Sequence, residues 1–258
     1  MDRNRQIEAI AQTEEEKMLL LRVCDKLERA MQRDMPASTA FLSLHEQALA
    51  AQILPNCCFF GGTEEAERKV AFYLPEYLTQ EEFFEDGPIC CIRASFYEEN
   101  TLSHRDMLGA LMGTGIRRDA VGDLCLHDNA CDIFVLSELS RYLLDNLTSA
   151  GRNHLKTEQI ALSDAIRLPQ KMKELRITVS SLRLDGVLSA AFHLSRGDTA
   201  EAIRTGKAER NSLTCLKPDR AVEESDTLSL RGCGKLKILG INGETRKGRI
   251  ALTVGIYL

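Results

Sequence analysis

The chain has 258 residues, of which 44% are apolar and 28% charged, and its formal net charge at neutral pH is −5. This composition is typical of a soluble globular protein with room for two or three domains. No run approaches the roughly 18 consecutive apolar residues that a membrane helix needs, and the charged N-terminal segment lacks the apolar stretch of a signal peptide. We therefore expect a cytoplasmic protein without a membrane partner.

Nine cysteines could indicate a disulfide framework or a metal site. Their number is odd, no Cys-x-x-Cys occurs, and two adjacent pairs, Cys57-Cys58 and Cys90-Cys91, lie in apolar strand-like runs. Neighbouring strand side chains point to opposite faces, so such a pair cannot easily chelate one ion. We predict that the cysteines are small buried side chains in a reducing compartment, with no metal and no cofactor.

Residues 1–80 are predicted to form an N-terminal α/β subdomain. A buried strand is expected to run into Gly61-Gly62 and a polar helix start, where converging N–H groups could cradle a phosphate. The segment lacks the Lys-Ser/Thr of a P-loop and the spacing of a dinucleotide fingerprint, which favours a tight structural turn. The predicted elements are helices at Ile7–Ala11, Met18–Met31 and Ser43–Ile53, and strands at Cys57–Phe60 and Lys69–Leu74.

Residues 84–165 alternate as βαββαβ, which predicts a ferredoxin-like plait. That fold can stack RNA bases on aromatic residues of its central strands. Here Ile89–Arg93 contains no aromatic residue, and only Phe96, Tyr97 and Phe134 lie nearby, so base stacking is not favoured. The predicted elements are strand Ile89–Phe96, helix Ser103–Met112, strands Asp123–His127 and Cys131–Val135, helix Leu136–Leu147 and strand Asn153–Ala161.

A polar motif opens the first helix of this section. His104-Arg105-Asp106 matches the start of a kinase catalytic loop, but the later kinase motifs are absent. Ser103 as N-cap with Asp106 three residues on explains the pattern structurally. The helix ends in a glycine-rich turn followed by Arg117 and Arg118. These two arginines, with Arg105, are predicted either to make a secondary RNA contact or to belong to a solvated loop.

Residues 176–258 are predicted to form a small α/β domain with two short helices. Leu184, Val187, Leu188, Ala191 and Phe192 follow the spacing of an amphipathic helix. Ser195 is the expected N-cap of a second helix that buries Ala200 and Ile203 and stops at Gly206. The predicted strands that follow are Thr227–Arg231, Leu236–Ile241 and Ile250–Tyr257.

Charge is divided unevenly along the chain. Residues 176–258 hold 14 Lys and Arg against 9 Asp and Glu, a net +5, while residues 1–175 hold 19 against 29, a net −10. A basic module on an acidic body indicates a polyanionic partner, although the same charges could form a merely solvated face. The residues predicted to contact RNA are Arg183, Ser195, Arg196, Arg204, Lys207, Lys217, Arg231 and Lys235.

The motif from Arg183 to Pro218 resembles the S4 RNA-binding domain in residue types, spacing and the strands that follow. The resemblance implies that the helix pair docks on structured RNA, with basic side chains reaching phosphates. The chain departs from the family pattern at Ala208 and Arg210, where apolar residues are preferred, and at Ser225, where glycine is usual.

The whole chain resembles the YlmH-type bacterial RNA-binding proteins. The resemblance rests on Phe60-Gly61-Gly62 with Ala66-Glu67-Arg68, on the run from His104 to Arg118 continuing through Gly122-Asp123, and on the C-terminal module. It implies a cytosolic bacterial protein that binds ribosomal RNA and tRNA. We also expect a monomer without catalytic residues, with the large ribosomal subunit as its partner. Members are linked to the rescue of subunits blocked by peptidyl-tRNA.

Three other classes of function are weighed against this expectation. Arg183-Leu184-Asp185 echoes a pseudouridine synthase motif, but this aspartate lies within the binding module and no synthase core accompanies it. A DNA-binding helix-turn-helix protein shares the helix pair, but the trailing strands and the acidic body argue against DNA. A cell-division-linked scaffold would need a docking surface that the sequence does not identify. The predicted fold class is α+β, with domains at 1–80, 84–165 and 176–258.

Overall fold

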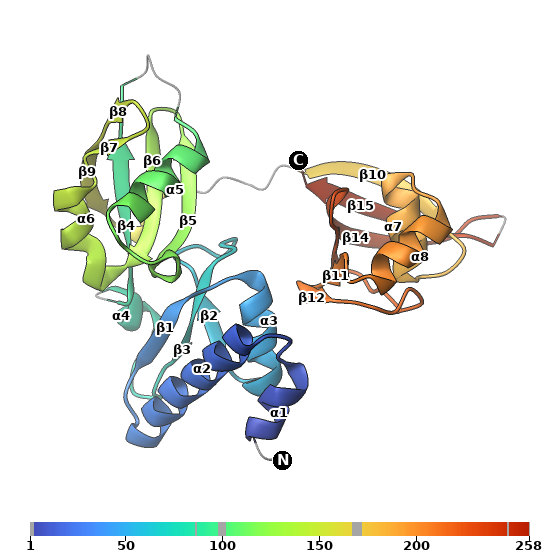
Figure 1. The fold of residues 1–258 in the computed structure, drawn as a ribbon, viewed down its shortest axis with the longest axis horizontal. Coiled ribbons are helices and arrows are strands. Elements are labelled where there is room, and N and C mark those ends of the chain that lie inside the picture. The colour runs from blue at the N-terminus through green and yellow to red at the C-terminus, as the bar shows by residue number, and fades with distance from the viewer. Residues whose placement is uncertain (1–2, 86, 98–101, 167–171, 247, 258) are drawn as a thin grey trace. The chain divides into compact units, whose positions relative to one another are not determined.

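The computed structural model describes residues 3–85, 87–97, 102–166, 172–246 and 248–257. It divides into two compact units, Met1–Pro169 and Gln170–Leu258 (Figure 1). Both units mix helices with antiparallel sheets, which agrees with the predicted α+β class. None of the described helices is long and apolar enough to cross a membrane.

The first unit begins with three helices and a three-stranded antiparallel sheet of order β1-β3-β2. Thr13 caps α2 by accepting a hydrogen bond from the amide of Glu16, and Leu20 and Leu27 bury the inner face of this helix. The elements are α1 (Arg3–Ile10), α2 (Glu14–Arg33), β1 (Ala37–Leu42), α3 (Leu44–Ile53), β2 (Cys58–Phe60) and β3 (Lys69–Tyr73).

Four details of this region differ from the sequence-based expectations. Strand β1 was not predicted, and neither was the short helix α4 (Gln80–Glu85). The predicted buried strand before Gly61 is wrong in its burial, because Cys58 is exposed and Phe59 and Phe60 are only half-buried. No helix follows Gly62, where residues 62–68 form turns and bends instead.

A four-stranded antiparallel sheet of order β5-β6-β4-β9 completes the first unit. Its elements are β4 (Ile89–Ser95), α5 (His104–Gly113), β5 (Val121–His127), β6 (Ala130–Leu136), α6 (Ser140–Asn146) and β9 (Lys156–Ile160). Short 3-10 turns lie at Arg118–Ala120, Ser137–Leu139 and Leu162–Asp164. The predicted strand Asn153–Ala161 is two strands, because β8 (Asn153–His154) pairs with β7 (Ser149–Ala150) before β9 joins the main sheet.

The alternation of side chains along β4 and β6 gives this sheet two buried faces. On one face, Ile92 and Ile133 pack with residues of α5 and α6, such as Leu111. On the other, Cys91 and Phe134 pack in a cluster with residues of the N-terminal region and the 162–165 turn. The N-terminal elements and the central sheet therefore share a core within one unit.

The second unit is a six-stranded antiparallel sheet of order β10-β15-β14-β13-β11-β12 with two helices packed on it (Figure 1). The first strand was not predicted; it pairs with the last along its whole length, from Met172 opposite Tyr257 to Val179 opposite Ile250. The elements are β10 (Met172–Val179), α7 (Leu184–Phe192), α8 (Arg196–Arg204), β11 (Ala208–Arg210), β12 (Leu213–Thr214), β13 (Thr227–Leu230), β14 (Gly234–Glu244) and β15 (Ile250–Tyr257).

The amphipathic pattern of the helix pair correctly identified the core of this unit. Leu184, Val187, Leu188 and Ala191 of α7 are buried, and Ile203 of α8 joins the same cluster. These side chains pack with buried residues from the sheet, which fixes the two helices on it. The helices therefore present their polar residues from a rigid support.

All nine cysteines are free. Cys90 and Cys91 are buried on opposite faces of the central sheet, which confirms the predicted burial of that pair. Burial raises the pKa of the Cys131 thiol to about 12, so this side chain is a neutral core residue at physiological pH. The prediction is wrong for Cys58 and Cys233, which are exposed because they lie at a short strand and in a turn.

Candidate RNA-binding surface

The start of α7 is held by the backbone of a later loop. The amides of Leu184 and Asp185, left without partners inside the helix, donate to the carbonyls of Arg220 (2.9 Å) and Pro218 (3.0 Å). Arg183, the exposed N-cap residue, forms a bidentate ion pair with Asp185, whose carboxylate oxygens lie 3.1 and 3.0 Å from its Nε and Nη2. The site therefore combines Arg183 with the basic loop 217–220.

This loop carries two exposed cations, Lys217 and Arg220. Lys217 was among the predicted contacts, and Arg220 was missed. The turn between them is closed by the amide of Arg220 donating to the Lys217 carbonyl at 3.1 Å. The sequence could have indicated Arg220, because it follows Lys217-Pro218 by two residues.

Arg196, at the start of α8, contacts Ser180 and the first turn of α7. Ser195 caps this helix as predicted, with its hydroxyl accepting the Asp198 amide at 3.1 Å. Arg196 Nη2 donates to Ser180 Oγ at 2.8 Å, and it lies 3.3 Å from where a Cβ on Gly186 would stand. Arg196 therefore reaches back across the first turn of α7 while staying exposed, so its position is fixed relative to both helices.

Arg204 and Lys207 lie at the other end of α8 from Arg196. Arg204 is exposed and paired with Glu201, also exposed, at 3.6 Å. The carbonyl of Lys207 accepts the amide of Arg231 at 2.8 Å, which places these two exposed basic residues side by side. Apart from Lys235, the predicted contacts therefore form two groups, one at each end of α8.

Lys235, the last predicted contact, lies on β14 with its ammonium group 4.8 Å from the centroid of the Tyr257 ring. This cation–π contact occupies one face of that ring. That face of Tyr257 is therefore not free to stack on an RNA base.

A buried carboxylate holds Arg210, one of the residues at which the chain departs from the S4 pattern. Asp226 is buried and accepts hydrogen bonds from Arg210 Nε (2.6 Å), Asn211 Nδ2 (2.7 Å) and the Glu223 amide (2.8 Å). Burial raises the pKa of Asp226, but these hydrogen bonds outweigh it and hold the pKa below its usual value. Ser225 adopts a φ of 71°, the left-handed conformation that explains the usual glycine.

The three arginines of the central region differ in how far their side chains are exposed to a ligand. Ser103 and Asp106 form the predicted capping box at the start of α5, and Arg105 is exposed on that helix. Arg117 has a side chain 72% exposed and paired with Asp119. Arg118 donates to the carbonyl of Val121 at 2.5 Å, and burial, followed by the nearby Arg68 cation, lowers its pKa.

Arg118 is therefore held by the protein, whereas Arg105 and Arg117 face solvent. The turn bearing Arg117 borders a hollow of about 490 Å³ that is also lined by Ala40 of β1 and Tyr142 of α6. The hydroxyl of Tyr142 donates to the Thr114 carbonyl at 2.6 Å, which fixes the glycine-rich turn to α6.

The Gly61-Gly62 motif is a packing junction. Gly62 has a φ of +94°, and a Cβ there would stand 2.3 Å from the ring of Phe134. Asp123 of β5 accepts the amides of Glu67 (2.6 Å) and Arg68 (3.1 Å), and Arg68 Nε donates to the Val121 carbonyl at 3.0 Å. These contacts bind the N-terminal elements to the central sheet, which favours a structural turn over a phosphate cradle.

The same junction covers the sheet face on which related folds stack bases. Phe134 is 1% exposed beneath the N-terminal elements. Arg93 and Asp132 on this face form a bidentate ion pair, and Asp132 also accepts the amide of Ile166 at 2.8 Å. Tyr97, 81% exposed, lies beyond the end of β4. This sheet face therefore presents no aromatic platform among its described residues.

In the described ranges, no cluster of three or more histidine, cysteine, aspartate or glutamate side chains is arranged to hold a metal ion.

Comparisons with known proteins relate the chain to RNA-binding proteins. A family model described as "Putative RNA-binding domain in YlmH" matches residues 95–164. The "Ribosome-associated protein quality control protein P2" of Bacillus subtilis (strain 168) is 34% identical over 221 residues, which are 83% of this chain and 85% of the relative. The chain belongs to the YlmH family.

Among solved structures, this YlmH-family chain resembles "Cell division protein ylmH from Streptococcus pneumoniae" with a TM-score of 0.49 and 19% identity. That likeness covers 61% of this chain and 98% of the other.

Proposed function

We propose that this YlmH-family protein is a cytoplasmic, monomeric and non-catalytic RNA-binding protein. Its target would be structured rRNA and tRNA on the large ribosomal subunit, in the quality control of stalled peptidyl-tRNA complexes. Family membership and the name of the Bacillus subtilis relative support the quality-control role. The charge and geometry of the second unit support the location of the site.

We further propose that the second unit is an S4 domain and that the central sheet is a ferredoxin-like plait. The strand order β5-β6-β4-β9 with α5 and α6 on one face is that of a plait, and the α7–α8 pair with its sheet supports the S4 assignment. The domain division would then be 1–80, 84–165 and 176–258, with the first two sharing the core around Phe134.

The observation that carries the proposal is the set of exposed cations on the α7–α8 pair and on the loops beside it. Arg183, Arg196, Lys207, Lys217 and Arg231 are all exposed in a part of the chain with a net charge of +5. Cations on fixed backbone neutralise phosphates without first having to be ordered, and each contact releases counterions from the RNA.

Recognition should depend on phosphates and shape rather than on base stacking. Phe134 is buried, and Lys235 lies over the ring of Tyr257. We therefore expect folded RNA to compete much better than homopolymer single strands, and better than duplex DNA, at the same salt concentration.

A catalytic role is not supported by the local geometry of Arg183-Leu184-Asp185. The Asp185 carboxylate is buried, accepts from both Arg183 nitrogens and also accepts the amide of Gly186 at 2.8 Å. These contacts give it a structural role at the start of α7. No turnover is expected when uridine-containing rRNA is incubated with the protein and analysed for modified bases.

The test compares two double variants of the full chain. Lys207→Gln with Arg231→Gln removes the adjacent pair at the end of α8, and Lys173→Gln with Arg246→Gln removes one exposed Lys and one exposed Arg elsewhere in the same unit. With about four to six phosphates neutralised, log K of the wild type should fall with log salt with a slope of about −3 to −5.

The Lys207/Arg231 variant should make that slope shallower by about two units and weaken binding to all folded RNAs alike. The Lys173/Arg246 variant should stay close to wild type. Equal losses in both would mean that net charge alone matters. A shallow wild-type slope with a preference for single strands would refute the proposed mode of recognition.

A further inference from the structure

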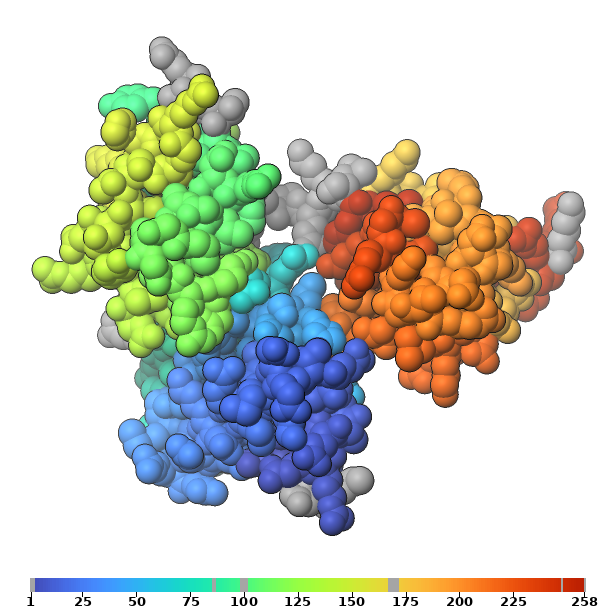
Figure 2. All heavy atoms as spheres, in the orientation of Figure 1, coloured from blue at the N-terminus to red at the C-terminus, as the bar shows by residue number. Residues whose placement is uncertain are grey.

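The long helix α2 carries a row of basic residues on a unit that is otherwise acidic. Arg22, Lys26, Arg29 and Arg33 are spaced 4, 3 and 4 residues apart, which keeps them within about 60° of one another around the helix axis. All four are exposed, whereas Leu20, Val23 and Leu27 on the inner side are buried. We name these four cations the α2 basic face; α2 lies at the surface of the first unit (dark blue in Figure 2).

The α2 basic face is not neutralised by the protein. In the described ranges, none of its four side chains forms an ion pair, and the only hydrogen bond found is from Arg22 Nε to the Met18 carbonyl of the same helix at 3.2 Å. The nearby carboxylates of Asp25 and Glu28 both pair with Arg3 of α1. Four adjacent like charges therefore repel one another in the free protein, and a polyanion would relieve that repulsion.

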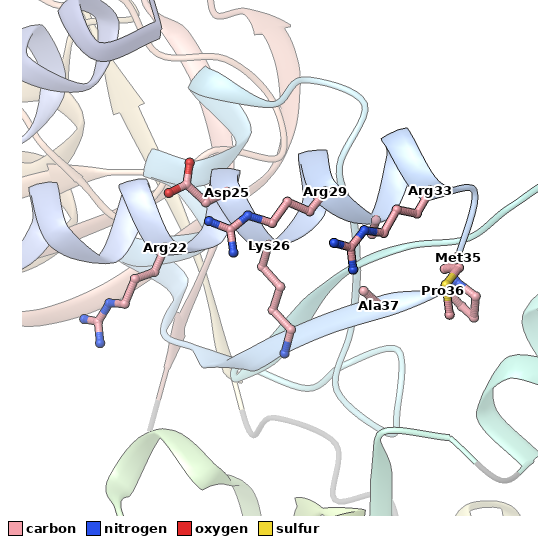
Figure 3. Close-up of a pocket in the computed structure, with 9 residues that line it drawn as sticks. Arg22, Asp25, Lys26, Arg29, Arg33, Met35, Pro36 and Ala37 are labelled. Atoms are coloured by element: carbon pink, nitrogen blue, oxygen red, sulfur yellow. The ribbon is translucent and has the colours of Figure 1, made fainter.

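The four cations border an open groove with a volume of about 420 Å³, which is also lined by Asp25, a carboxylate paired with Arg3. Asp34, in the left-handed conformation with a φ of 49°, ends α2 and reverses the chain, so that Met35, Pro36 and Ala37 close one end of the groove. Figure 3 shows the basic side chains spaced along the helix beside this end. None of the described residues that line the groove is aromatic, so these residues offer charge without a surface for base stacking.

An adjoining hollow limits the extent of this surface. It measures about 660 Å³ and shares Lys26, Pro36 and Ala37 with the groove, but Glu82 and Glu138 also line it. These carboxylates would repel phosphate. A bound nucleic acid strand is therefore expected to follow α2 rather than cross into the hollow.

We propose that the α2 basic face is a second RNA-binding site, which holds the phosphates of a folded RNA along about 16 Å of helix. The inference rests on the RNA-binding function proposed above. An RNA backbone fits because it presents a row of regularly spaced negative charges, matching a row of cations on a rigid helix. The acidic first unit would then contribute directly to affinity, in addition to the basic second unit.

The test uses the full chain and a deproteinised transcript of large-subunit rRNA. The variant Lys26→Gln, Arg29→Gln, Arg33→Gln is compared with Lys173→Gln, Arg176→Gln, Arg246→Gln. Each removes two arginines and one lysine from exposed positions, so the net charges are equal. The control positions lie outside the predicted RNA contacts and outside residues 95–164. Circular dichroism should show both variants folded, because the replaced side chains lie outside the core.

The α2 variant should bind the transcript at least tenfold more weakly at a fixed salt concentration. The slope of its log K against log salt should be shallower than that of the wild type by about two to three units. The control variant should stay within twofold of wild type. A photo-crosslinking residue in place of Met35 should attach to the transcript, whereas one in place of the exposed Met172, outside residues 95–164, should not.

The Lys207/Arg231 variant, measured in parallel, separates the two proposals. If it loses affinity while the α2 variant and its control bind like wild type, the α2 site is refuted and the proposed function stands. If the wild type does not bind the transcript, both proposals are refuted. If the α2 variant keeps RNA affinity but loses binding to phosphatidylserine vesicles or to a polyglutamate peptide, the surface serves a membrane or an acidic protein and not RNA.

Discussion

Replacing Gly62 by alanine tests the role of the glycine pair that precedes β3. In the structure Gly62 is buried with a φ of +94°, and an added Cβ would stand 2.3 and 2.5 Å from two ring carbons of Phe134. Phe134 lies in the core shared by the N-terminal elements and the central sheet, so its ring cannot move freely. The substitution should therefore loosen the contact between these two parts of the first unit.

Two costs contribute to the expected loss of stability. A side chain in the left-handed conformation costs about 1–2 kcal/mol, and forcing a methyl group into a packed core costs about 1–3 kcal/mol. Together they should lower the free energy of unfolding by about 2–5 kcal/mol. For a unit of this size, that corresponds to a fall in Tm of about 5–15 °C.

Gly109→Ala is the matched control, because this glycine lies in the middle of α5 with no atom within 4 Å of an added Cβ. It should stabilise the same unit by about 0.5–1 kcal/mol. Calorimetry of the full chain measures both variants, and RNA affinity is measured well below the transitions. A Gly62→Ala protein with unchanged Tm and weakened RNA binding would refute the packing junction and favour a phosphate cradle.

Three further predictions follow from single side chains. Asp226→Asn should lower the free energy of unfolding by about 2–3 kcal/mol. Because the pKa of Asp226 in the folded protein is below its usual value, this difference should be complete above about pH 4 and shrink as the pH falls through the folded pKa. Urea unfolding at several pH values measures it. Maleimide should label Cys58 in the native protein but reach the buried Cys91 only on unfolding, and equal labelling rates would contradict the assigned burial. Arg196→Ala should weaken RNA binding by about 1–2 kcal/mol, whereas Arg196→Lys should restore part of it; loss of the folded circular dichroism spectrum in Arg196→Ala would instead assign this side chain to the fold.

The helix pair and its caps could be predicted because their determinants are local. Leu184 and Leu188 repeat at helical spacing, and Ser195 supplies the hydroxyl that the first turn of α8 needs. The capping box at Ser103 is encoded in the same way, within four residues. The charge difference between the two ends of the chain is likewise a property of the sequence alone.

Strands β1 and β10 were missed for two different reasons. β1 contains Ala37, Ser38 and Ala40, which have weak strand signals, and it is held by pairing with β3 about 30 residues later. β10 does show alternation at Leu175, Ile177 and Val179, which was a usable signal. Its partner is the last strand of the chain, however, and such distant pairing is not encoded locally.

The sequence by itself determined most of the helices, where the core of the second unit lies and where positive charge is concentrated. Only the tertiary structure decided what each cation does. Arg118 donates a hydrogen bond to the carbonyl of Val121, and Arg196 extends across the first turn of α7 to Ser180. The basic row from Arg22 to Arg33 has no carboxylate partners in the part of the chain that the structure describes. The physical reason is that helix formation depends on neighbours within a few residues, whereas a charge is neutralised by whichever groups the fold brings near it.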